Sequence, residues 1–272
     1  MKSKLPALPY IIWIVLFTVI PLGLVVYFAF TNDAGAFSFE AFEGSIKYMP
    51  VLLKSLKLAF IATVICLVLA YPLAYIMSRA DVSKQRMMLL LIMLPMWMNF
   101  LLRTYAWLTL LEDTGLINRF LALLGFEPVK MINTEGAVVL GMVYNYLPFM
   151  VLPLYSIMEK IDKSVIEASQ DLGSNGFNVF YKVILPLSVP GIVTGITMVF
   201  VPAVSTFIIS QLLSGGKQRL IGDLIQIFFM GMGGAPDFHL GSALAMVLMV
   251  IMLICMGFMN RLDDEDKEGM VI

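Results

Sequence analysis

The sequence predicts an all-α integral membrane protein with six transmembrane helices. Of its 272 residues, 60% are hydrophobic and 14% are charged, and the mean hydropathy is +0.91. Soluble domains carry roughly 25% charged residues, so this composition favours lipid as the surrounding medium. Apolar runs of about 20 residues, the length that crosses a bilayer as a helix, recur six times along the chain. Because backbone groups in lipid must hydrogen-bond internally, these runs should be helical.

The first apolar run is long enough to remain in the membrane. Its 21 residues exceed the apolar core of a signal peptide, which is about 7–15 residues, so we expect a retained anchor. Arg103, late in the third run, is the one charge inside any of them. The six expected spans are 10–30, 58–77, 87–111, 136–158, 187–213 and 240–260.

Basic residues indicate the orientation of these spans. Arg79, Lys84 and Arg86 crowd one short connection, and such residues concentrate on the cytoplasmic side of membrane proteins. We therefore expect both termini in the cytoplasm. The connections 78–86 and 159–186 and the acidic tail 261–272 are then cytoplasmic, and 31–57, 112–135 and 214–239 lie outside.

Several classes of function lack the residues they need. The net charge of −1 and a pI near 5.9 argue against a nucleic-acid surface. Cys66 and Cys255 both fall in apolar runs, and the single His239 cannot form a histidine metal site alone. The nearest approach to a phosphate-binding loop has Gln218 where a hydroxyl is required. We expect a chain that is not an enzyme and binds no metal or cofactor itself.

A polar stretch, 159–186, separates two of the most apolar runs. Ser164 and Glu167 have the spacing of a capping box, which predicts a helix from 164 to 172. Gly173 can supply the positive φ that ends such a helix. A second helix should follow, with apolar residues at helical spacing, and should end at Pro186 before the fifth span. These features alone leave open whether the helix pair lies at the membrane surface or docks a partner.

The residues of this stretch resemble the EAA signature of bacterial ABC importer permeases. Both the spacing and the position before the fifth of six spans agree with that family, and Ser169 and Val183 are conservative departures from it. The resemblance implies a MetI-like type-1 permease with an anchor span and outer loop at 1–53, a core at 54–260 and a tail at 261–272. The residues that would form the ATPase-coupling loop are Glu167, Ala168, Ser169, Gly173, Leu185 and Pro186.

The resemblance also implies partners. Permeases of this family sit in the bacterial inner membrane and pair with a second, homologous permease. Two cytoplasmic ATPase subunits bind the coupling loops, and an extracytoplasmic binding protein delivers the cargo. ATP and Mg²⁺ would be used by the ATPase subunits, and no cofactor would be bound by this chain.

Other stretches are similar to the spermidine/putrescine permeases of the same family. The third run contains Asn99, Arg103, Tyr105 and Trp107 in an N-x-x-x-R-x-Y-x-W pattern. Stretches 143–155 and 211–222 are also similar to that group. A polyamine is then the expected cargo. The alternatives are another small solute such as iron, or a stand-alone secondary transporter.

Polar and aromatic residues within the spans are candidates for the pathway of a cationic cargo. Cation–π contacts are worth about 0.5–2 kcal/mol each, and Asn99, Tyr105, Tyr144 and Asn145 provide aromatic faces and amides. Trp107 can alternatively belong to an interfacial aromatic belt. Arg103 would repel a cation, so we expect it to pair with an acid, either Glu112 or Asp113 or an acid of the partner subunit.

Overall fold

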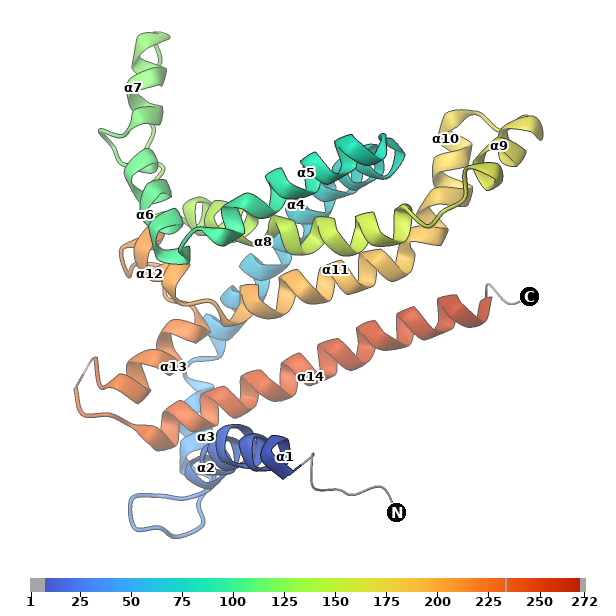
Figure 1. Ribbon diagram of the computed structural model, residues 1–272. Helices are drawn as coiled ribbons and strands as arrows, with labels where there is room; N and C mark the ends of the chain where they lie inside the picture. The colour runs from blue at the N-terminus through green and yellow to red at the C-terminus, as the bar shows by residue number, and fades with distance from the viewer. Residues whose placement is uncertain (1–7, 233, 270–272) are drawn as a thin grey trace, which may run out of the picture.

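The computed structural model describes residues 8–232 and 234–269, and most of them are helical. Five helical segments are long and apolar enough to cross a membrane, and a sixth is a bent pair. The five are Leu8–Ala29, Met49–Arg79, Glu135–Met158, Gly176–Ser205 and Phe238–Met259. Figure 1 shows the long helices lying roughly side by side, with α9 and α10 at one end and α12 and α13 at the other. The first seven residues of the predicted anchor and the last three of the predicted tail lie outside the described residues.

Three helices form the core: α4 (Met49–Arg79), α8 (Glu135–Met158) and α11 (Leu185–Ser205). Small side chains recur along one face of α4, which lets the neighbouring backbones approach closely. They are the fully buried residues Ala59, Ala62, Cys66, Ala70 and Ala74. Large apolar side chains of α8 fill the space opposite them, since Met142, Met150 and Leu154 are all 0% exposed.

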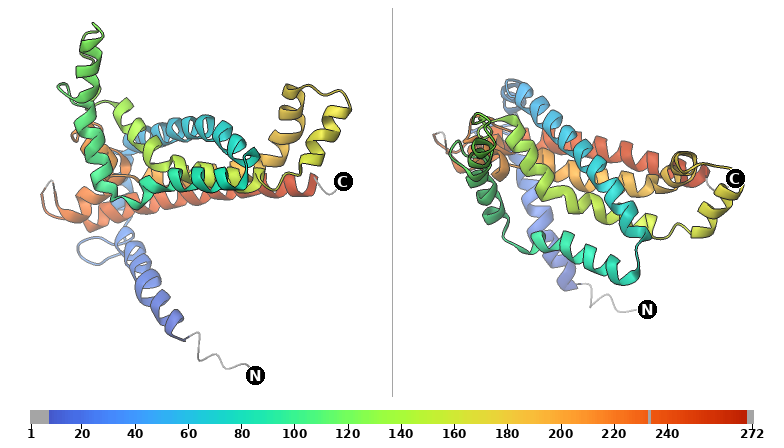
Figure 2. Two further views of the ribbon diagram at one scale, coloured as in Figure 1. Left: turned by 45° about the horizontal axis from the view of Figure 1, so that its top comes forward. Right: turned by 90° about the horizontal axis from the view of Figure 1, so that it is seen from above.

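The first span packs mainly against the last. It consists of α1 (Leu8–Ile14), η2 (Val15–Val19) and α2 (Ile20–Ala29), and α2 contacts α14 (Phe238–Gly269). Figure 2 shows this first helix projecting away from the rest of the bundle. Its apolar side chains are almost all exposed, which is the pattern of a helix surrounded by lipid. The short helix α3 (Glu40–Ile46) follows and also contacts α14.

The predicted span over 87–111 is present but is divided into two helices. The chain forms α5 (Val82–Trp97) and α6 (Phe100–Leu111), and the bent pair that continues through α7 (Leu116–Leu123) turns by 89°. Pro95 removes one backbone donor just before the turn. Asn99 then caps α6, because its Oδ1 accepts the Leu101 N–H at 2.8 Å. The run is apolar as predicted, but the local backbone chemistry breaks the helix.

The prediction of a fifth helix over 187–213 is wrong at both ends. The helix already begins in α10 (Gly176–Val179), passes through η3 (Phe180–Ile184) and ends with α11 at Ser205. Pro186 does not end a helix. The Leu185 N–H donates to the Phe180 carbonyl five residues back, and this π-type bond shifts the helical hydrogen-bond register just before the proline. Thr206 is extended, so α12 (Ile208–Ser214) is a separate helix, followed by α13 (Ile221–Met230).

The predicted domain boundaries at 53/54 and 260/261 both fall inside continuous helices, α4 and α14. The division of the chain at these positions stays a prediction.

Candidate functional site: coupling loop, pathway residues and outer network

The loop helix α9 (Lys163–Asp171) is capped by Asp162 rather than by Ser164. Asp162 has extended backbone angles, and its Oδ1 accepts the Ser164 N–H at 3.0 Å. This hydrogen bond lowers the pKa of the exposed Asp162 carboxyl. The predicted N-cap at Ser164 is therefore wrong, because the helix is capped two residues earlier, where Asp162 accepts the hydrogen bond.

Gly173 ends this helix as the sequence predicts. Its φ is +85°, a left-handed conformation that suits glycine. The Ser174 N–H donates to the Ser169 carbonyl at 3.1 Å, and the Gly173 N–H donates to the Gln170 carbonyl at 2.8 Å. These two bonds form the Schellman motif, which satisfies carbonyls that the helix end would otherwise leave free.

The loop exposes apolar side chains beyond the end of the core helices. Leu172 is 89% exposed, Phe177 73% and Tyr181 61%, and the last two rings stack with centroids 6.5 Å apart. Among the signature residues, Glu167, Ala168 and Pro186 are exposed, whereas Ser169 and Leu185 are half-buried. An exposed apolar patch on a protruding loop is typical of a docking surface.

One hydrogen bond at the base of the loop attaches it to α4, and further bonds join the end of α4 and α8 to α5. Arg79 Nη1 donates to the Ile161 carbonyl at 3.2 Å, just before α9. Gln85 Nε2 donates to the Ala80 carbonyl at 3.0 Å, and the Tyr155 hydroxyl of α8 donates to Gln85 Oε1 at 3.2 Å. Arg79, Gln85 and Ile161 border a cavity of about 610 Å³ between the α4–α5 turn and the start of α9. The segment just before α9 is thus held to the end of α4.

The pathway candidates separate into two groups. Asn99 and Tyr105 are exposed on α6, and Asn99 is used as the helix cap. Tyr144 is half-buried on α8, and its ring meets that of Trp107 edge to face with centroids 5.4 Å apart. Asn145 is 2% exposed and donates to the Gly141 carbonyl at 2.9 Å. Its Oδ1 accepts no hydrogen bond from the residues that the structure describes.

Arg103 does not pair with Glu112 or Asp113, so that part of the prediction is wrong. Among the side chains that the structure describes, in residues 8–232, 234–259 and 261, no carboxylate lies within 4.0 Å of its guanidinium, which instead sits 5.9 Å from the centroid of the Phe100 ring. Glu112 directly follows α6, nine residues beyond Arg103, roughly 13.5 Å along the helix axis and on the opposite face. Arg103 is 8% exposed, and Nε and Nη1 have no partner among the described residues.

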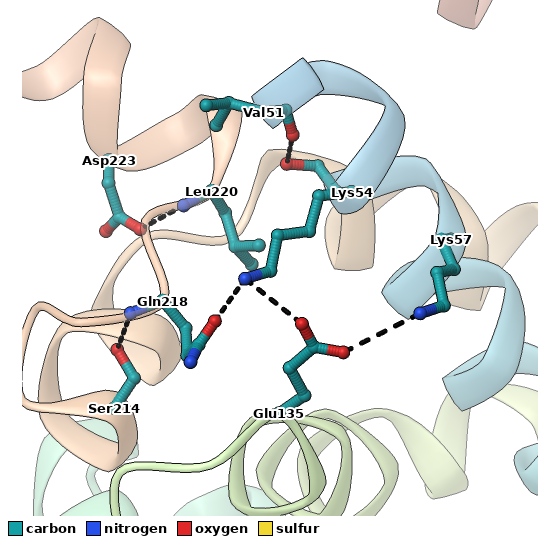
Figure 3. A network of polar contacts seen from close by, with 9 residues as sticks. Val51, Lys54, Lys57, Glu135, Ser214, Gln218, Leu220 and Asp223 are labelled. Carbon is teal, nitrogen blue, oxygen red and sulfur yellow. Dashed lines mark hydrogen bonds and ion pairs between the residues drawn. The ribbon is translucent and has the colours of Figure 1, made fainter.

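Opposite the coupling loop, a polar network joins three segments of the chain (Figure 3). Glu135, the first residue of α8, forms ion pairs with two lysines of α4. Lys54 Nζ lies 3.1 Å from Oε1 and Lys57 Nζ lies 3.7 Å from Oε2. Lys54 Nζ also donates to the side-chain oxygen of Gln218, in the turn after α12. The Gln218 N–H is held by Ser214 Oγ at 3.1 Å.

A buried carboxylate supports the same turn. Asp223 Oδ2 accepts the Leu220 N–H at 2.7 Å and the Ser210 hydroxyl at 2.6 Å, and the residue is 2% exposed. Burial raises the pKa of Asp223, although these two donors act in the opposite direction. The Ile221 N–H donates to Ser55 Oγ of α4 at 2.8 Å. Sequence reasoning missed this network; its one local signal is Lys54 and Lys57 lying one helical turn apart.

This arrangement, with apolar spans and a helix–glycine–helix loop before the fifth of them, defines a membrane permease of the ABC importer class. The model of the family described as "Binding-protein-dependent transport system inner membrane component" matches residues 5–264, and the chain belongs to this family. Its members are transport subunits, so the chain is a permease and not an enzyme.

Relatives within the family carry names that describe a cargo. The chain is 39% identical over 253 residues to the spermidine/putrescine transport system permease protein PotB of Haemophilus influenzae, covering 89% of this chain and 87% of that one. It is 37% identical over 250 residues to PotB of Escherichia coli K12, covering 88% and 90%. It is 30% identical over 226 residues to the inner membrane ABC transporter permease YdcU of the same strain, covering 78% and 71%.

A solved structure shares the fold. A chain of a bacterial ABC transporter that imports the acidic polysaccharide alginate superposes with a TM-score of 0.79 at 17% sequence identity, covering 95% of this chain and 93% of that one. At this identity the likeness concerns the fold alone.

Proposed function

We propose that this chain is one permease subunit of an ATP-driven importer of the polyamines spermidine and putrescine. The observation that carries the proposal is the 37–39% identity, over nearly nine tenths of the chain, to permeases named for these two solutes. The aromatic pair Trp107 and Tyr144 agrees with a cationic cargo, because aromatic faces attract ammonium groups.

The subunit would work with a second homologous permease, two cytoplasmic ATPases and an extracytoplasmic binding protein in the bacterial inner membrane. A related alginate importer has been solved with its periplasmic binding protein in complex. The exposed apolar patch around Leu172 and Phe177 supports docking of an ATPase against the loop. With that loop in the cytoplasm, both termini are cytoplasmic as well, and ATP and Mg²⁺ bind the ATPases.

Transport would proceed by alternating access. Closure of the two ATPases on ATP would displace α9, with Glu167, Ala168 and Ser169 near the contact and Gly173 permitting close approach. The hydrogen bond from Arg79 to Ile161 would pass that displacement to α4, and the bond from Gln85 to Ala80 would pass it on to α5. Rocking of helix bundles about a central site then exposes the site to one side at a time. ATP drives this change only because it binds the closed state better.

The proposal is tested by reconstitution. The chain is co-expressed with its partner permease and ATPases, placed in liposomes with the binding protein and ATP, and the uptake of labelled spermidine and putrescine is measured. ATP-dependent uptake that stops with a hydrolysis-deficient ATPase is the expected result. Uptake of a different solute with no polyamine uptake would overturn the cargo assignment. Uptake by the chain alone without ATP would instead support a stand-alone secondary transporter.

A further inference from the structure

We infer that Glu135 and Gln218 form an extracytoplasmic binding site for a primary ammonium group, in which Lys54 is a resident occupant that the cargo displaces. The inference rests on the proposed function and deepens it by naming a site for the cargo and an opening step.

The site is built from two acceptors that converge on one ammonium. Glu135 Oε1 lies 3.1 Å from Lys54 Nζ, and the amide oxygen of Gln218 accepts from the same nitrogen (Figure 3). The acceptors come from different elements, the start of α8 and the turn after α12, and Ser214 fixes the backbone of that turn. The other carboxylate oxygen, Oε2, faces the second ammonium, that of Lys57, at 3.7 Å.

The location suits cargo that arrives from outside. Glu135 begins α8 and the coupling loop follows its other end, so the two lie roughly 36 Å apart along a helix of 24 residues. Helix α4 has 31 residues and is about 46 Å long, which exceeds the hydrocarbon core of a bilayer by several turns. The lysine turn at its start therefore lies beyond the lipid core, and the Glu135 side chain is 42% exposed.

Replacement of the Lys54 ammonium by an ammonium group of the cargo changes the free energy of the site little. The incoming ammonium has the same charge and the same three donors as Lys54, so the interactions broken and formed are matched. Ion pairs between partly exposed side chains are weak, and the resident lysine can therefore leave. A polyamine carries two or more ammonium groups on one chain and can meet both oxygens of Glu135, as Lys54 and Lys57 do together.

Displacement has a structural consequence. The Lys54–Glu135 pair and the Lys54–Gln218 hydrogen bond join the outer end of α4 to α8 and to the turn after α12. When a free ammonium takes the place of Lys54, the acceptors stay satisfied but these connections are gone. Cargo thereby favours the state in which the outer ends of the spans separate.

A purely structural role of the Lys54–Glu135 ion pair predicts different effects of mutation on cargo binding. If Lys54 and Glu135 only hold the fold together, removing either partner weakens the same contact and affects cargo binding in the same direction. If Lys54 competes with the cargo, removing it strengthens cargo binding, and removing Glu135 weakens it. The sign of the two effects therefore separates the two interpretations.

The test measures equilibrium binding of labelled spermidine to the assembled permease–ATPase complex without the binding protein. We expect Lys54→Met to tighten binding about fivefold, Glu135→Gln to weaken it by at least as much, and Lys57→Met to change it less, because Lys57 is the more distant lysine. Glu135→Asp serves as a folding control that keeps the charge. Titration with Mg²⁺ at matched ionic strength distinguishes ammonium recognition from general screening.

Shifts of the same sign for Lys54→Met and Glu135→Gln would overturn the inference, as would an unchanged affinity in Glu135→Gln. These outcomes leave the proposed function standing as long as the wild-type complex imports polyamines. A correctly assembled wild-type complex that imports neither spermidine nor putrescine contradicts the proposed function itself.

Discussion

Trp107 of α6 packs edge to face against Tyr144 of α8, with ring centroids 5.4 Å apart and an interplanar angle of 71°. The contact joins the bent third span to the core helix that precedes the coupling loop. Trp107 is half-buried in this contact. Trp107 therefore packs within the helix bundle, which its assignment to an interfacial belt does not include.

The energetic coupling of this pair can be measured by a double-mutant cycle. Trp107→Ala, Tyr144→Ala and the double variant should give a coupling of about 0.5–1.5 kcal/mol in the free energy of unfolding in detergent. Tyr105→Ala, combined with Tyr144→Ala in the same way, is the control, because Tyr105 is 51% exposed. A coupling near zero for Trp107 and Tyr144 would show that the rings do not stabilise each other.

Tyr144→Ala should also lower polyamine uptake while the complex still assembles, if the ring lines the pathway. The measurements are initial uptake in vesicles and co-purification of the ATPase. Normal uptake by this variant would remove Tyr144 from the pathway and leave it a packing residue.

Gly141 is required for close packing of α8 against α12. A Cβ at this position would lie 2.5 Å from Leu213 Cδ1 and 2.8 Å from Ile209 Cγ2, and both side chains are fully buried. Gly141→Ala should therefore destabilise the chain by about 1–3 kcal/mol through overpacking. Gly136→Ala is the matched control on the same helix, because its Cβ would meet only Thr134 Oγ1 at 3.7 Å. Thermal unfolding of both variants checks the difference; equal midpoints would contradict it.

Gly173→Ala should weaken the end of α9. An L-residue at φ +85° costs roughly 1–2 kcal/mol, although the position is open, since a Cβ added there would have no atom within 4 Å. We expect less ATPase retained on the complex and slower ATP-driven uptake. Gly176→Ala, three residues away and also open, lacks the positive φ and should behave like the wild type. Identical retention in the two variants would argue against a role for the turn.

Asp223 should make the stability of the chain depend on pH. Because burial raises the pKa of Asp223 in the folded state, folding favours the protonated carboxyl. The contribution of Asp223 to the free energy of unfolding has its full value below the ordinary pKa of about 3.9. This contribution is lost as the pH rises through the higher pKa of the folded state. Asp223→Asn should remove this component, so the free energy of unfolding measured from pH 4 to 7 should decline less steeply in the variant.

The exposed Asp113→Asn is the control for Asp223, and it should leave the pH profile of the wild type unchanged. A wild-type profile parallel to that of Asp223→Asn would show that the buried carboxyl does not titrate in this range.

The apolar runs and the glycine turn were predictable because each depends on neighbours along the chain. Hydropathy over about 20 residues located all six spans, although the third is bent and the fifth ends early. Local spacing predicts the helix end at Gly173, and the signature around Glu167 indicates the family to which the chain belongs. The roles of the signature and pathway residues remain predictions.

Other features depend on contacts that no local pattern contains. Lys54 and Glu135 are 81 positions apart, and Gln218 is 164 from Lys54, so only the packing of α4, α8 and the turn after α12 brings them together. Arg103 does not meet Glu112, because helical geometry places that residue, just past the end of α6, on the opposite face. The sequence by itself determined which segments are apolar enough to enter lipid and where the helix–glycine–helix loop lies. The tertiary structure decided which charges meet and where the spans bend, because hydropathy measures transfer into lipid and does not specify which side chains or backbone groups face each other.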